Sequence, residues 1–131
     1  MPNPPKPIEQ KRLLGNPGKR ALPKNTVELE PVGFSPVPLR PLFEAGQVFW
    51  DDAWNKGVLW LGRTDVHLVQ MTAEMFDERE DLRRVIAERV LAGDDDVWRD
   101  RRQLRDLERS LITNLSLMAW TPVDRSRYGL A

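Results

Sequence analysis

The sequence predicts an all-α protein in which a long antiparallel helical hairpin follows a proline-rich basic arm. Two long stretches carry apolar residues at three- and four-residue steps, as on one face of an α-helix, and a short acidic turn separates them. Nine of the eleven prolines fall in the first 40 residues, where they oppose regular helix and sheet. We therefore expect an extended or partly disordered arm over residues 1–40 and a helical domain over residues 41–131.

Charge is distributed unevenly, although twenty acidic residues balance twenty basic ones. The first 40 residues hold seven bases and three acids, whereas residues 41–93 hold six bases and ten acids. A basic arm on an acidic body favours a polyanionic partner for the arm. The chain has no cysteine, one histidine, no secretory segment and no apolar run of the roughly 20 residues that span a membrane. We expect a soluble intracellular protein with no cofactor, no metal and no membrane partner.

The first helix is expected from about Pro41 to Asn55, because proline suits the first turn of a helix. Gly46 weakens the middle of this helix by up to about 1 kcal/mol relative to alanine. Its broad apolar face comprises Leu42, Phe49, Trp50, Ala53 and Trp54. The end of the arm offers four apolar side chains that could hold it on the body, namely Val37, Leu39, Leu42 and Phe43.

A second helix is expected from about Val66 to Leu91, with either Thr64 or Asp65 as its N-cap. At about 1.5 Å per residue this helix would be about 40 Å long. Its apolar side comprises Val69, Ala73, Phe76, Leu82, Ile86 and Val90.

A third helix is expected from Asp94 to about Trp120, because consecutive acids suit the N-terminal end of a helix dipole. A heptad-like seam marks its inner side at Leu104, Leu107, Leu111, Leu115 and Met118. A short final helix should follow Thr121 as N-cap, with Pro122 in the first turn and Gly129 as the stop.

The stretch from Arg12 to Arg20 reads Arg-Leu-Leu-Gly-Asn-Pro-Gly-Lys-Arg and combines turn-forming residues with cations. A Leu-Gly-Arg-Thr-Asp segment precedes the second helix, and Thr-Pro-x-x-Arg-x-x-x-Gly closes the chain. In this order the features resemble the small subunit of phage DNA-packaging terminases, in the branch marked by the Gly-Asn-Pro-Gly-Lys-Arg element. Many relatives in that family carry a longer segment between the two long helices, which here is shortened to residues 92–96.

The resemblance implies a non-catalytic protein that assembles as a homo-oligomeric ring in the host cytoplasm. Such a subunit binds double-stranded viral DNA, delivers it to the large terminase subunit, which holds the ATPase and nuclease, and regulates packaging. A structural or adaptor protein of the virion or packaging machine, with protein contacts only, is the alternative from a different class.

Candidate DNA contacts are cations of the arm and of the last helix. They comprise Lys6, Lys11, Arg12, Lys19, Arg20, Lys24, Arg125 and Arg127. Composition alone is equally consistent with an arm that only improves solubility, and the resemblance favours DNA. The arm could also dock on the large subunit. We expect the arginines between Arg99 and Arg109 to form ion pairs within or between subunits, because acids interrupt them.

Five tryptophans in a small domain are candidates for subunit contacts, with ordinary core packing as the alternative. They are Trp50, Trp54, Trp60, Trp98 and Trp120. No nucleophile with a base is evident, and the glycine motif lacks the spacing and the Ser or Thr of a phosphate-binding loop. The acids at 94–96 lack a nearby Glu or His partner for a catalytic metal. We therefore expect no enzymatic activity and no catalytic residue.

Overall fold

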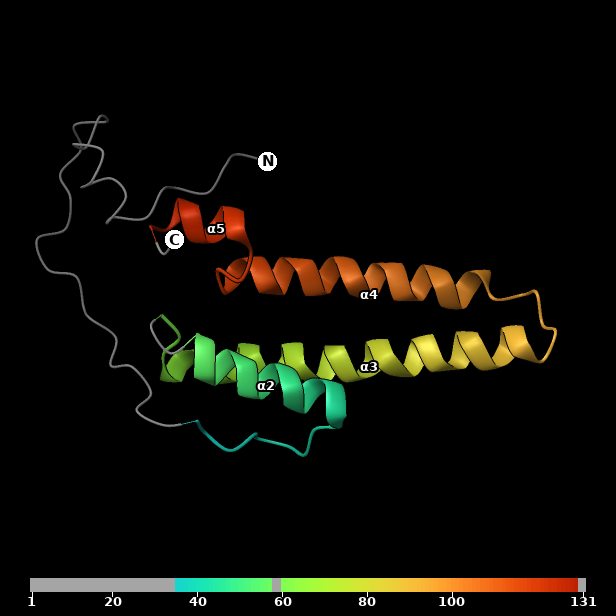
Figure 1. Cartoon of the computed structure of the whole chain (residues 1–131), viewed down its shortest axis with the longest axis horizontal. Helices are drawn as coiled ribbons and strands as arrows, with labels where there is room; N and C mark the ends of the chain where they lie inside the picture. The colour runs from blue at the N-terminus through green and yellow to red at the C-terminus, as the bar shows by residue number, and fades with distance from the viewer. Residues whose placement is uncertain (1–34, 58–59, 130–131) are drawn as a thin grey trace, which may run out of the picture. The chain divides into compact units, whose positions relative to one another are not determined.

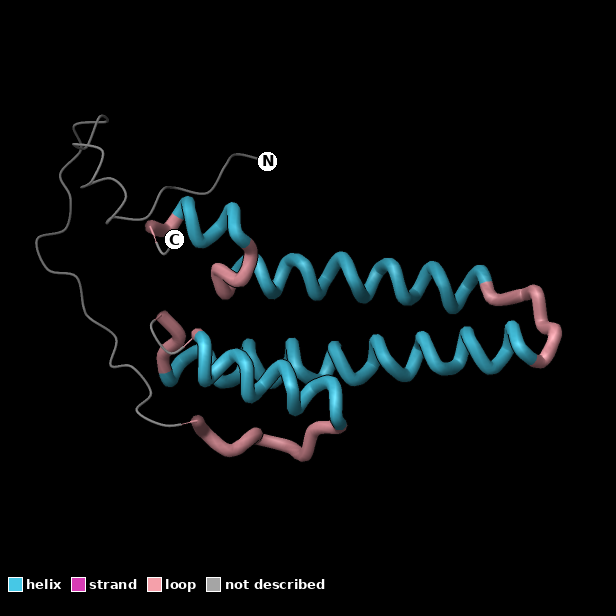
Figure 2. Tube along the Cα trace, viewed as in Figure 1, coloured by secondary structure: helices cyan, strands magenta, loops and turns pink. Residues whose placement is uncertain are grey.

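The computed structural model describes residues 35–57 and 60–129. They belong to two units, which are described separately. Along the chain, the boundary between them falls between Leu115 and Ser116. The described residues contain helices and no β-strand (Figure 2), which confirms the all-α prediction. The elements are α2 (Glu44–Lys56), the 3-10 helix η1 (Arg63–Asp65), α3 (Val66–Leu91), α4 (Trp98–Leu117) and α5 (Pro122–Arg127). The predicted arm lies, for residues 1–34, outside the described part of the chain.

Helices α3 and α4 run antiparallel as the predicted hairpin (Figure 1). Polar contacts connect the two helices at three levels. Asn114 Nδ2 donates to Thr72 Oγ1 over 3.3 Å, Arg79 lies 3.3 Å from Glu108, and Arg89 pairs with Asp100. Between them, Leu111 and Ile86 are buried. The hairpin is thus fixed in register by polar pairs around a narrow apolar seam.

The predicted start of the third helix was wrong by four residues, because α4 begins at Trp98. The Asp94 carboxylate accepts a hydrogen bond from the Asp96 N–H over 2.9 Å and pairs with Arg89 at 2.8 Å. The acids therefore shape the turn instead of the first helical turn. At its other end α4 stops at Leu117, short of the predicted Trp120, and Ala119 adopts a positive φ of 56°.

The core of the larger unit lies between α2 and the first half of α3. Trp50 and Ala53 on α2 and Val69 and Ala73 on α3 are at most 1% exposed. The rings of Phe49 and Phe76 lie with their centroids 4.9 Å apart. Helix α2 begins at Glu44, three residues after the predicted start.

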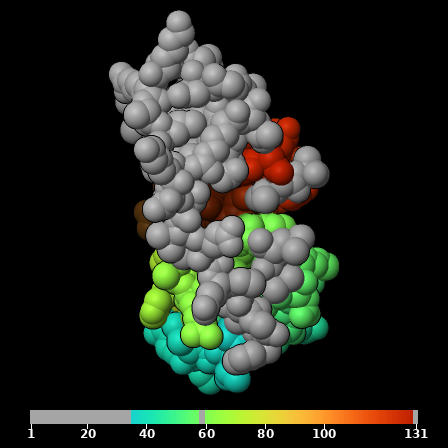
Figure 3. All heavy atoms as spheres, turned by 90° about the vertical axis from the view of Figure 1, so that its left-hand side faces the viewer, coloured from blue at the N-terminus to red at the C-terminus, as the bar shows by residue number. Residues whose placement is uncertain are grey.

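Polar contacts join residues 36–43 to α3. Three of the four apolar side chains that were predicted to hold this segment are exposed, whereas Leu42 is partly buried. The Leu39 N–H donates to Gln70 Oε1 over 3.0 Å, and Arg40 forms an ion pair with Glu74 at 2.8 Å. The indole of Trp50 donates to the Pro36 carbonyl over 2.8 Å. Val37, Leu39 and Phe43 are 84%, 53% and 77% exposed. In the space-filling view these residues, in cyan, lie beside the yellow-green start of α3 (Figure 3).

N-caps were predicted for α3 and for α5, and the structure bears out only the one for α5. Neither Thr64 nor Asp65 caps α3 with its side chain, because the Asp65 carboxylate accepts the Gly62 N–H over 2.7 Å and closes η1. In the smaller unit, the Thr121 hydroxyl accepts the Asp124 N–H over 3.2 Å, with Pro122 in the first turn of α5. The prediction for this last helix is therefore confirmed.

Candidate nucleic-acid interface

Six of the eight cations predicted to contact DNA belong to the arm, and two belong to α5. Lys6, Lys11, Arg12, Lys19, Arg20 and Lys24 lie outside the described residues. Arg125 and Arg127 lie on α5, but they differ in their surroundings. The Arg125 guanidinium donates to the Trp120 carbonyl within the same unit, whereas Arg127 is exposed. Arg127 is thus the more accessible of the two.

Arg127 also contributes to the electrostatics of α5. Hydrogen bonds from the Thr121 hydroxyl and from Ser116 lower the pKa of Asp124, and the positive charge of Arg127 lowers it further. The ionised Asp124 lies in the first turn of α5, where a negative charge is favourable. Asp124 therefore stabilises the start of this helix.

The tryptophans fall into two groups. Trp50 and Trp54 are 1% and 3% exposed, so core packing accounts for both, and neither is available to a second subunit. Trp60 and Trp120 are partly buried. Trp98, at the first turn of α4, is 57% exposed. Of the five candidates, Trp98 is the one that the described structure presents most openly to a partner.

Within one chain, Arg109 alone among the described arginines of α4 forms an expected ion pair, and ion pairs between subunits stay a prediction. Arg109 lies 3.3 Å from Asp106, and both side chains are well exposed. The other two acids of α4 within this stretch, Asp100 and Glu108, pair instead with Arg89 and Arg79 of α3. The antiparallel register turns these acids toward α3 and leaves the remaining arginines of α4 without a carboxylate in the described structure.

Four of the exposed side chains of α4 share one side of the helix, which we call the arginine face. It comprises Trp98, Arg102, Arg105 and Arg109. Their steps of four, three and four residues place them in one row. Together with Asp106 they line a shallow hollow of about 460 Å³. Neither Arg102 nor Arg105 has a carboxylate within ion-pairing distance among the described residues.

The arginine face is a short cationic row along α4. Arg102 and Arg109 are separated by about 10 Å along the helix axis. The guanidinium of Arg99 lies 5.4 Å from the centroid of the Trp98 ring, so a cation also stacks at the end of the row. The sequence carried a usable signal, the four-three-four spacing, but interspersed acids obscured it.

The described residues contain no group of three or more His, Cys, Asp or Glu side chains that could hold a metal ion. His67 is exposed, and the Asp94 carboxylate is held by Arg89 and the Asp96 backbone. Among the helices that can be described, none combines the length and apolar character needed to cross a bilayer.

Comparisons with protein-family models, with curated proteins and with solved structures find no match to this chain.

Proposed function

We propose that this chain is the small subunit of a phage terminase: a non-catalytic protein that binds double-stranded viral DNA. It assembles as a ring in the host cytoplasm, delivers DNA to the large ATPase and nuclease subunit, and regulates packaging. The sequence resemblance, with Arg12 to Arg20 as its most specific part, supports this identity. The arginine face of α4 is the structural observation that carries the DNA-binding role.

Electrostatics favour a polyanionic partner for this face. Arg102 and Arg105 have no carboxylate partner in the described structure, so phosphate binding would not have to displace an existing ion pair. The Arg109 and Asp106 pair is exposed and therefore contributes little by itself. Each phosphate that an arginine neutralises releases counterions and makes binding more sensitive to salt. A basic arm of seven cations against three acids would add to the same attraction.

A mobility-shift titration with viral and unrelated duplex DNA over a series of salt concentrations tests the proposal. We expect the full chain to bind, with an affinity that falls steeply as salt rises. The double variant Arg102→Gln with Arg105→Gln should bind more weakly, and the slope of log K against log salt should fall by about two. Deletion of residues 1–24 should also weaken binding and flatten the slope.

The matched control removes two charges elsewhere. Arg63→Gln with Arg84→Gln changes one exposed arginine of η1 and one exposed arginine of α3, so its slope should stay near that of the unchanged chain. Equal losses in both double variants would attribute binding to net charge and reject the role of α4. Absence of binding even at low salt would reject the DNA-binding function and favour the adaptor alternative.

A further inference from the structure

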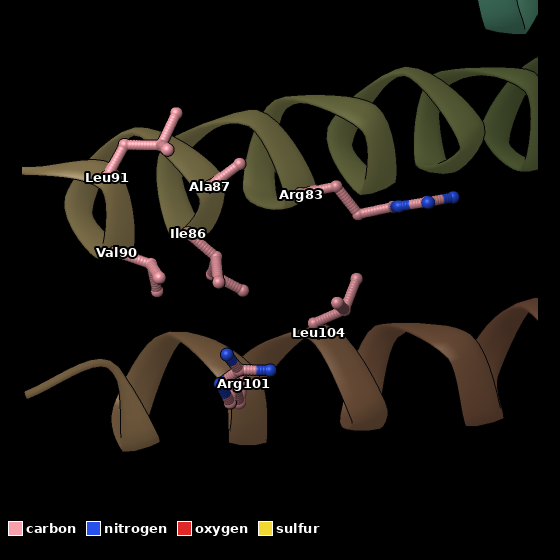
Figure 4. A pocket seen from close by; sticks show the side chains of 7 residues that line it. All are labelled: Arg83, Ile86, Ala87, Val90, Leu91, Arg101 and Leu104. Carbon is pink, nitrogen blue, oxygen red and sulfur yellow. The ribbon is translucent and has the colours of Figure 1, made fainter. Parts of the chain in front are cut away.

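An apolar groove runs between α3 and α4 near their connecting turn. Figure 4 shows its lining from both helices. The groove has a volume of about 510 Å³. The lining residues are Arg83, Ile86, Ala87, Val90, Leu91, Arg101 and Leu104. Val90 and Leu91 are 48% and 88% exposed, although both are large apolar side chains. The groove therefore presents apolar surface that no described part of the chain covers.

The groove continues the surface on which α2 packs. Helix α2 has 13 residues and α3 has 26, so α2 can cover only half of α3, as Figure 1 shows. Steps of four and three residues lead from Ala73 and Phe76 beneath α2 to Ala87 and Val90 in the groove. A second helix in line with α2 would cover the remaining half of this surface. A helix is therefore the kind of element whose shape fits the groove.

The charges beside the groove indicate which kind of helix would bind there. Arg83 and Arg101 flank the apolar groove from α3 and α4. Arg101 has no carboxylate partner in the described structure, and Arg83 lies 3.8 Å from an exposed Glu80. A fitting helix therefore carries an apolar side chain between carboxylates.

The outer face of α2 has this chemistry. Val48 is 58% exposed on the side opposite the core, and acids lie three or four residues from it in both directions. They are Glu44, Asp51 and Asp52. Asp52 is paired with Lys56 at 3.1 Å, whereas Glu44 and Asp51 have no cationic partner within the described residues. Two surfaces of the same chain are thus complementary in charge and in apolar character.

We propose that the outer face of α2 from one copy docks in the α3–α4 groove of the next copy. This contact rests on the self-assembly in the proposed function and names the surfaces that would produce it. Because the two surfaces differ, the contact is head-to-tail, and such contacts generate rings when the rotation closes. Each copy uses its groove for one neighbour and its α2 for the other.

Measurement of mass in solution, by light scattering coupled to size exclusion, tests this contact through charge reversal and rescue. The unchanged chain should be an oligomer. Arg101→Glu and Asp51→Arg, each at an exposed position, should each lower the mass to that of a monomer or a short oligomer. An equimolar mixture of the two variants should regain the large mass. In the mixture, the groove of Arg101→Glu meets α2 of Asp51→Arg, and both charges of that contact are reversed. The groove of Asp51→Arg meets α2 of Arg101→Glu, and neither charge of that contact is reversed.

Two further variants serve as an additional test and as a control. Leu91→Ser removes apolar surface at a side chain that is 88% exposed, so it should lower the mass without loss of helical circular dichroism. Arg84→Glu reverses a charge of α3 outside the groove and should retain the mass of the unchanged chain.

The outcomes separate this contact from the wider proposal. An oligomer that survives Arg101→Glu, Asp51→Arg and Leu91→Ser would overturn the contact while leaving self-assembly intact. A monomeric unchanged chain would overturn both the contact and the ring, and the DNA titration would then decide DNA binding on its own. Loss of mass in the single variants without recovery in the mixture would overturn the pairing of these two surfaces.

Discussion

The backbone N–H of Gly46 on α2 donates a hydrogen bond of 2.7 Å to the carboxylate of Asp77 on α3. The other oxygen of this carboxylate accepts the Phe43 N–H over 2.9 Å. Asp77 thus satisfies two backbone donors at the start of α2, where a helix lacks partners of its own and favours negative charge. A Cβ at position 46 would lie 2.4 Å from Asp77 Oδ2 and 2.6 Å from the Ala73 carbonyl oxygen. The close approach of the two helices therefore requires glycine.

Gly46→Ala should destabilise the protein although alanine is the better helix former. Propensity favours alanine by about 1 kcal/mol. Overpacking costs about 1–3 kcal/mol, and the upper end applies because a backbone carbonyl and a hydrogen-bonded carboxylate are the nearest obstacles. We expect a net fall of about 2 kcal/mol in the free energy of unfolding, measured with urea. Asn55→Ala, exposed on the same helix, should be neutral or slightly stabilising; a similar gain in Gly46→Ala would refute the steric argument.

Leu111→Ala should destabilise the packing of α4 on α3. Leu111 is the buried residue of α4 in the larger unit, at 3% exposed, and truncation of a buried leucine costs about 2–5 kcal/mol. Its neighbour Ile112 is 62% exposed, so Ile112→Ala should change stability by no more than about 0.5 kcal/mol. Thermal unfolding followed by circular dichroism compares the two. Equal effects would contradict the packing of α4 on α3.

Gln70→Leu should weaken the attachment of residues 36–43 to α3. Gln70 is 3% exposed, accepts the Leu39 N–H, and donates to Glu74 over 3.0 Å. Loss of these hydrogen bonds should cost about 1 kcal/mol and speed chymotrypsin cleavage at Leu39. Mass spectrometry of the fragments over time measures the effect. Gln103→Leu, at an exposed position of α4, is the control, and equal cleavage rates would show that Gln70 does not hold this segment.

The turn between α3 and α4 should weaken in acid. A hydrogen bond from the Asp96 N–H, with a second contribution from Arg89, lowers the pKa of Asp94 in the folded chain. Ionised Asp94 therefore adds stability that is fully present above its unfolded pKa of about 3.9. That stability is lost as pH falls from about 3.9 through the lower pKa of the folded state.

Urea unfolding at a series of pH values checks this assignment. Asp94→Asn should reduce stability at pH 7 and show a smaller further loss between about pH 5 and pH 2 than the unchanged chain. Asp95→Asn is the control, because the structure gives the Asp95 side chain no ion pair within the described residues. Parallel pH curves for the unchanged chain and Asp94→Asn would rule out the contribution of Asp94.

Local signals predicted much of the fold, because the relevant contacts are close in sequence. Both ends of α3 follow from the turn before Val66 and from Ala92-Gly93, and α5 follows from Thr121 and Pro122. The sequence could not predict which acids pair with which arginines, since that depends on the register of α3 against α4. The same register exposes Arg102 and Arg105. Helix propensity alone makes Gly46 a weak point of its helix, whereas the structure places the Ala73 carbonyl of α3 where a side chain at position 46 would lie.

The unequal lengths of α2 and α3 also have a consequence for motion. Amide hydrogens of α3 beneath α2, from Val69 to Asp77, should exchange with solvent slowly, because the buried core must open first. Amides near Leu91 should exchange much faster, through local fraying of the uncovered end. We therefore expect local opening to be rare where α2 covers the hairpin and more frequent toward its tip. A partner that binds the tip would slow exchange near Leu91 and so reduce the difference in exchange rate between the two ends of α3.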